Sequence, residues 1–191
     1  MAVTNLKIKN CNTGIILVGA EPINSFVDGS REAEVCAQLY PQVVQSWLER
    51  FPWRFSMKLV TLSKLTGVTP LYGFNYAYQL PSDRLQDVFS LQNRATQYRI
   101  VGDQLHTNSE DFKMEYQFEV AEEYWPKSFT LGVGYSMAAV IARAVLEDEK
   151  MAKRYDDKAE EMYKIARRAE SQASQSERID DSQFLLTAVR G

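Results

Sequence analysis

The side chains best suited to chemistry are few in this chain and lie far apart in the sequence. His106 is the only histidine among 191 residues, and the hairpin predicted around it has no obvious acid or nucleophile beside it. We therefore assign His106 no catalytic role, because general base catalysis needs a reacting group within reach. Cys11 and Cys36 lie on apolar helical patterns, which predicts buried free thiols rather than a disulfide. Two cysteines and one histidine are also too few for a four-ligand zinc site.

One pair of acids adjoins an aromatic ring. Glu122 and Glu123 precede Trp125, and two carboxylates beside a ring are typical of sites that hydrolyse sugars. Acids at this position are also ordinary partners for the positive end of a helix dipole, and we favour that interpretation. Gly132-Val133-Gly134 lacks the third glycine and the preceding strand of a dinucleotide loop. The sequence therefore predicts no catalytic residue, no metal site and no cofactor site.

The elements that would position these residues are helices at both ends of the chain. Helical periodicity covers residues 4–18, and a broad apolar face runs from Val35 to Leu48. After Trp125 the sequence is almost continuously apolar and rich in small residues from Leu131 to Leu146, which indicates a helix buried on most sides. A charged helix with an apolar seam follows. On it we expect the four-residue ion pairs Glu149–Lys153 and Glu160–Lys164.

Between the helices the hydrophobic period shifts towards two, which indicates strands. Phe55, Met57 and Leu59 are expected to face inwards together, and a glycine turn at Gly102 predicts a hairpin. The predicted fold is α+β and mainly α. A helical bundle is expected from residues 1–52 and 121–175, a small antiparallel β lobe from residues 53–120, and an extended C-terminal tail from residues 176–191.

Composition narrows the class of protein. The net charge of −3 and the pI near 5.3 argue against a nucleic-acid binder, because affinity for phosphates needs surplus Lys and Arg. The apolar stretches are shorter than the roughly 20 residues of a membrane span, and no convincing signal peptide is seen. We expect a soluble protein made in a reducing cytoplasm.

Two apolar clusters suggest contacts with partners. The rings of Tyr72, Phe74, Tyr76 and Tyr78 share one strand parity, so they are expected on one sheet face. That face is either part of the core or a protein–protein surface. In the tail, a polar linker is followed by Phe184, Leu185, Leu186 and Val189. These four either fold back on their own core or dock on a partner, because a large exposed apolar site implies one.

The order of several short motifs resembles the tail tubular protein A family of short-tailed bacteriophages. The motifs are Val18-Gly19-Ala20-Glu21-Pro22-Ile23, Trp53-Arg54-Phe55, Tyr76-Ala77-Tyr78-Gln79-Leu80-Pro81-Ser82-Asp83 and, after Trp125-Pro126, Met137-Ala138-Ala139-Val140-Ile141-Ala142. Each motif alone is weak, but their order is fairly specific, and the resemblance covers nearly the whole chain.

The resemblance implies a structural virion protein without enzymatic activity. In that family about twelve copies form an adaptor ring between the portal protein and the tail nozzle protein, and DNA leaves through the lumen. It also implies that the tail segment with Phe184, Leu185, Leu186 and Val189 binds the portal, and that the free chain is largely monomeric. Tyr72, Phe74, Tyr76 and Tyr78 would serve a nozzle or protomer interface. The alternatives are a tail-associated peptidoglycan hydrolase using Glu122 or Glu123, and a non-viral helical interaction module.

Overall fold

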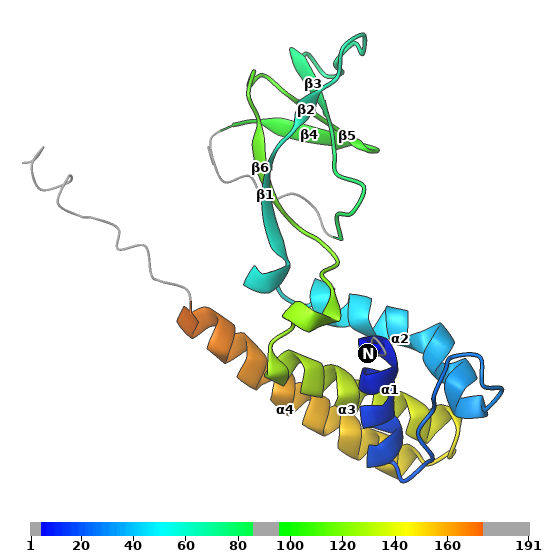
Figure 1. Ribbon diagram of the computed structural model, residues 1–191. Helices are drawn as coiled ribbons and strands as arrows, with labels where there is room; N and C mark the ends of the chain where they lie inside the picture. Colours follow the sequence, from blue (N-terminus) through cyan, green and yellow to red (C-terminus); the bar gives the residue numbers. More distant parts are fainter. Residues whose placement is uncertain (1–4, 86–95, 174–191) are drawn as a thin grey trace, which may run out of the picture.

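The computed structural model describes residues 5–85 and 96–173, which form a helical bundle with a β-rich lobe projecting from it (Figure 1). The predicted class, α+β and mainly α, is confirmed. In chain order the elements are α1 (Leu6–Leu17), α2 (Arg31–Glu49), η1 (Arg54–Ser56), β1 (Met57–Thr61), β2 (Ser63–Lys64), β3 (Tyr76–Gln79), β4 (Tyr98–Val101), β5 (Gln104–Thr107), β6 (Lys113–Gln117), η2 (Glu122–Tyr124), α3 (Lys127–Ala144) and α4 (Glu149–Ala173). The C-terminal tail, with Phe184, Leu185, Leu186 and Val189, lies outside the described residues.

Helix α3 is the centre of the bundle, and glycines bring its neighbours close. A Cβ on Gly14 of α1 would lie 2.8 Å from the backbone nitrogen of Ala138, and a Cβ on Gly134 would lie 2.8 Å from the Thr13 side chain. Both distances are shorter than packed atoms allow, so larger residues would force α1 away from α3. Gly14 and Gly134 therefore permit the close packing of α1 against α3 inside the bundle.

Aromatic rings fill the bundle core beside α3. The Phe129 ring makes edge contacts with Trp47, Trp53 and Trp125, at centroid distances of 5.5, 5.2 and 5.0 Å. The Trp47 indole lies against Gly132, where any Cβ would collide with the ring. Its Nε1 donates a hydrogen bond to Ser136 Oγ at 2.8 Å. One helical turn of α3 thus accommodates the ring and satisfies its polar atom.

The lobe has a sheet and a core of its own. β1 and β6 form an antiparallel ribbon, and a second antiparallel sheet has the strand order β2-β3-β5-β4. The hairpin predicted at Gly102 is confirmed, with β4 and β5 paired across it. Seven buried side chains form the separate lobe core: Leu62, Tyr78, Leu80, Leu105, Phe112, Met114 and Tyr116.

The predicted inward face of the first strand is wrong. Val60 lies opposite the buried Met114 and packs on the lobe core, whereas Leu59 lies opposite Glu115 and is 56% exposed. Directly paired residues of an antiparallel ribbon share a face, so the partner strand fixes which side of β1 is buried. Phe55 precedes the strand in η1 and belongs to the bundle core instead.

The lobe and the bundle meet at Gln117, the last residue of β6. This side chain is fully buried. Its Nε2 lies 2.7 Å from the carbonyl oxygen of Leu48, 3.0 Å from that of Phe51 and 2.9 Å from Ser56 Oγ. These carbonyls belong to the end of α2 and the turn after it, where backbone acceptors have no partner within a helix. Gln117 therefore joins the ribbon to the bundle.

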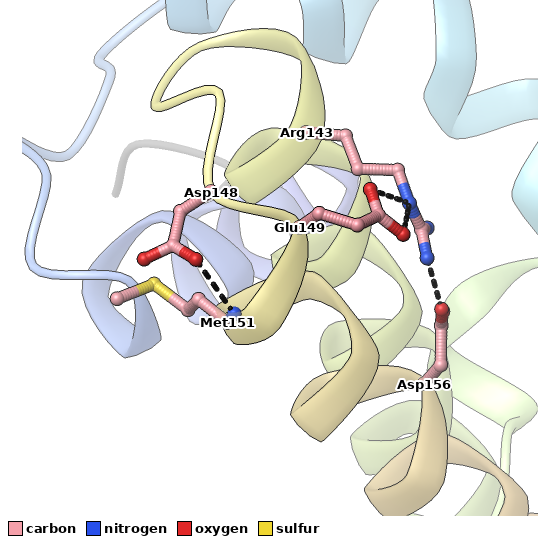
Figure 2. A network of polar contacts seen from close by, with 5 residues as sticks. All are labelled: Arg143, Asp148, Glu149, Met151 and Asp156. Carbon is pink, nitrogen blue, oxygen red and sulfur yellow. Dashed lines mark hydrogen bonds and ion pairs between the residues drawn. The ribbon is translucent and has the colours of Figure 1, made fainter.

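The predicted four-residue ion pairs along α4 are replaced by contacts to other elements. Arg143 lies between Glu149 and Asp156, and its Nε is 3.2 Å from Glu149 Oε2 (Figure 2). Glu160 pairs with Arg50 at 2.6 Å. Asp148 accepts a hydrogen bond from the backbone nitrogen of Met151, which caps α4 (Figure 2). Arg143 of α3 and Arg50 at the end of α2 thus contact Glu149 and Glu160, in place of the lysines four residues along α4.

Candidate interaction surfaces

The loop that leads into β3 lies at the end of the lobe away from the bundle (Figure 1). It contains a tight turn in which Phe74 N donates to Leu71 O at 3.2 Å, and Tyr72 and Gly73 both have positive φ, 59° and 78°. Two left-handed residues in succession suit glycine, Asn or Asp. Tyrosine in this conformation costs about 1 kcal/mol or more, so the surroundings must hold it.

His106 and Arg99 supply that support. Leu71 N donates a hydrogen bond to His106 Nδ1 at 2.9 Å, and His106 Nε2 lies 3.2 Å from Gln104 Oε1. Because Nδ1 accepts, the ring is a neutral imidazole with its proton on Nε2. The Arg99 guanidinium lies 3.9 Å from the centroid of the Tyr72 ring, a cation–π contact. His106 is buried, and both of its ring nitrogens have hydrogen-bond partners in this scaffold.

We call Val68, Leu71 and Tyr72 the lobe tip. Their side chains are 36%, 48% and 63% exposed. Exposed apolar residues on one loop are suited to contact with a partner. A tyrosine stacked with an arginine adds the two residue types that often dominate the binding energy of interfaces. The aromatic cluster in the sequence pointed to this loop. It did not predict that Val68 and Leu71 are exposed there.

The expectation that Tyr72, Phe74, Tyr76 and Tyr78 cover one sheet face is wrong. Strand β3 begins only at Tyr76, so strand parity does not extend to the first two residues. Tyr78 is 1% exposed in the lobe core, and Tyr76 packs partly against that core beneath Lys64. Of the four, only Tyr72 is largely exposed.

A groove of about 410 Å³ crosses the bundle between α2 and α4, with α3 at its base. Its apolar lining includes Leu39, Val43 and Val140, which are half-buried and partly open to solvent. Arg50 of the α2 terminus and Asp156 and Glu160 of α4 also line it. A concave surface with an apolar centre and charged residues suits an apolar peptide segment flanked by charges. We call it the bundle groove; beyond the apolar face of α2, no linear pattern indicated it.

The acids Glu122 and Glu123 both lie in η2, but their surroundings differ. Glu122 accepts a hydrogen bond from the Tyr40 hydroxyl at 3.4 Å and lies 3.9 Å from Lys7 Nζ. Burial, with Glu122 adding to it, raises the pKa of Tyr40 well above its usual range. Glu123 is exposed. Trp125 is 7% exposed, and its Nε1 donates to Val120 O at 3.0 Å, so its ring cannot stack on a sugar.

Cys11 and Cys36 are free and buried between α1 and α2, as predicted. A hydrogen bond to Cys36 and burial raise the pKa of the Cys11 thiol, so this thiol stays protonated and unreactive at neutral pH.

Within residues 5–85 and 96–173 no group of His, Cys, Asp and Glu side chains is arranged to hold a metal ion. No helix in the described part of the chain is long and apolar enough to cross a membrane.

Comparison with known proteins adds no family to this geometry. No protein-family model matches the sequence, and a search of curated proteins found no match.

Proposed function

We propose that this chain is a head-to-tail adaptor of a short-tailed bacteriophage. Copies of it form a ring, a dodecamer in the family that it resembles, between the portal protein and the tail nozzle protein. The bundle faces the portal, the lobe faces the nozzle, and the C-terminal tail residues Phe184, Leu185, Leu186 and Val189 bind the portal. The protein is made in the host cytoplasm and resides in the virion neck.

The observation that carries this proposal is the division of the protomer into two bodies, each with its own core and its own exposed apolar site. The bundle bears the bundle groove, and the lobe bears the lobe tip at its far end (Figure 1). An adaptor must contact two different partners at once, and two sites on separate bodies suit that task. Heterologous contacts between copies would close into a ring by rotation.

The charge supports a role beside DNA without binding to it. A net charge of −3 gives a channel of many copies little attraction for phosphates. DNA can then pass through the lumen without being retained.

Co-sedimentation with the cognate portal protein tests the proposal. The full chain should bind, and a chain that lacks residues 176–191 should remain folded by circular dichroism but fail to bind. Normal binding by the truncated chain would reject the role of the tail. Clearing of peptidoglycan by the purified chain, abolished by Glu122→Gln or Glu123→Gln, would instead support the hydrolase alternative.

A further inference from the structure

Two surfaces of the bundle carry opposite charges. The loop before α2 and the first turns of α2 contain one base, Arg31, and four acids: Glu21, Asp28, Glu32 and Glu34. Close to the end of α4, a stretch of five residues contains no acid and three bases: Lys164, Arg167 and Arg168. We call these surfaces the acidic end and the basic end.

The two surfaces lie at opposite ends of the bundle. Helices α2 and α4 run in the same direction, because Arg50 pairs with Glu160 and the backbone nitrogen of Arg54 donates to Glu170. Helix α2 has 19 residues, so its first turn lies about 28 Å from its end. The acidic end is therefore far from the basic end, and the lobe projects transversely to both helices (Figure 1).

Each end has an exposed apolar side chain beside its charges. Val27, directly before Asp28, is 89% exposed, and Ile165 is 46% exposed. Arg168 follows Ile165 by three positions on α4, so the two lie on the same helical face. An apolar centre with a charged rim is the usual composition of an interface between proteins.

The charges at the two ends are available to a partner. Among the residues that the structure describes, no ion pair involves the three bases of the basic end or the four acids of the acidic end. The acids nearest to the basic end on the inner side of α4 are already engaged, because Glu160 pairs with Arg50 and Glu170 accepts from Arg54 N. The exposed Glu161 lies one turn before Ile165. The outer side of this part of α4 is therefore mainly basic.

We propose that the acidic end of one copy binds the basic end of the next, with Val27 against Ile165. This inference names the contact between protomers and rests on the proposed ring. The two surfaces differ, so the contact is heterologous and can repeat from copy to copy. Like-charged ends repel each other, which gives all copies one orientation.

The size of the contact agrees with a free chain that is largely monomeric. Charged pairs at a rim raise the association rate and fix the orientation more than they raise the affinity. One apolar contact at the centre adds little to that affinity. Copies therefore associate only briefly in solution, and a portal that holds them side by side makes the contact lasting.

Cysteine crosslinking between two differently tagged full-length chains tests the contact without the portal. The acidic-end copy carries Val27→Cys, and the basic-end copy carries Ile165→Cys. In the control mixture Leu59→Cys replaces Val27→Cys, because Leu59 is 56% exposed but lies in the lobe. The native Cys11 and Cys36 are buried and remain in every chain.

Under mild oxidation the matched mixture should form mixed dimers at least about fivefold faster than the control mixture. Adding Lys164→Glu and Arg168→Glu to the basic-end copy should abolish this advantage. Adding Glu21→Lys and Glu34→Lys to the acidic-end copy as well should restore it. All four positions are exposed, so the variants are expected to fold.

Equal rates in the matched and control mixtures would overturn the proposed contact, and so would a failure of the second charge reversal to restore the advantage. The two proposals can fail separately. Portal binding without faster crosslinking of the matched mixture would reject this contact and leave the adaptor role standing. Faster crosslinking of the matched mixture by a chain that does not bind the portal would support the contact and reject the adaptor role.

Discussion

Gln117 provides a direct test of how the lobe is attached to the bundle. We consider Gln117→Met, which preserves the length of the side chain but cannot donate a hydrogen bond. The Nε2 group has two hydrogens and three acceptors within 3.0 Å, namely Leu48 O, Phe51 O and Ser56 Oγ. In the variant Leu48 O and Ser56 Oγ lose this donor, whereas Phe51 O keeps the hydrogen bond from Trp53 N at 2.8 Å.

The expected cost follows from the burial of these groups. Each buried acceptor that loses its partner costs about 1–3 kcal/mol. Part of this cost is offset, because Gln117 Oε1 is itself buried and has no hydrogen-bond partner among the described residues, and methionine removes that atom. We therefore expect a net loss of about 1–3 kcal/mol in the free energy of unfolding. In a chain of this length the melting temperature would fall by roughly 2–4 °C for each kcal/mol.

Urea denaturation followed by circular dichroism and tryptophan fluorescence measures this loss. Gln45→Met is the control, because Gln45 is exposed on α2 and its side chain donates a hydrogen bond to Glu49 at 2.7 Å. We expect the control to change stability by less than about 0.5 kcal/mol. If both variants unfold at the same urea concentration, the joint does not depend on the hydrogen bonds of Gln117.

Further predictions concern the bundle core, the lobe core and the lobe tip. Gly132→Ala should lower the melting temperature, because a Cβ collides with the Trp47 ring and overpacking costs about 1–3 kcal/mol, more than the helix propensity gained. Burial and the hydrogen bond to Asp83 raise the pKa of Tyr116 to about 12. The native state therefore favours the protonated phenol, and this stabilisation is complete below about pH 10 and is lost as the pH rises towards 12. Tyr116→Phe should remove that contribution to the alkaline loss in urea titrations at pH 9 and 11; an unchanged slope would contradict it. Tyr72→Asn should leave the melting temperature within a few degrees, since Asn accepts a positive φ, but should weaken nozzle binding in a pull-down. Undiminished binding would remove the lobe tip from the interface.

Patterns of one helix or one turn were enough to predict much of the fold. The apolar face predicted from Val35 to Leu48 carries most of the buried residues of α2, and the Gly102 hairpin pairs β4 with β5 as expected. The buried thiols Cys11 and Cys36 also lie where helical periodicity placed them. These features depend on residues close in sequence, so local propensities decide them.

The wrong predictions concern features that a partner element decides. Leu59 faces solvent because β6 determines the buried side of β1. Glu149 pairs with Arg143, which belongs to another helix, rather than with the residue four positions along. The Tyr72 turn departs from strand parity because His106 and Arg99 hold it in place. The two halves of each contact lie on different elements, so the periodicity within one element does not predict it.

The candidate sites were predictable only in part. The aromatic cluster pointed to the lobe tip, although only Tyr72 of its four members is largely exposed. Tyr78 is buried in the lobe core, and Tyr76 packs partly against that core. The bundle groove needs α2, α3 and α4 together, so no linear pattern marks it. The tail was recognisable from its apolar residues alone, and it lies outside the described residues.

Electron microscopy of the full chain mixed with its cognate portal protein tests the adaptor proposal most directly. We expect a ring of protomers bound to the portal, with each bundle against the portal and each lobe directed away from it towards the nozzle. A portal that remains bare at saturating concentrations of the chain would contradict the proposal, and so would protomers bound through the lobe.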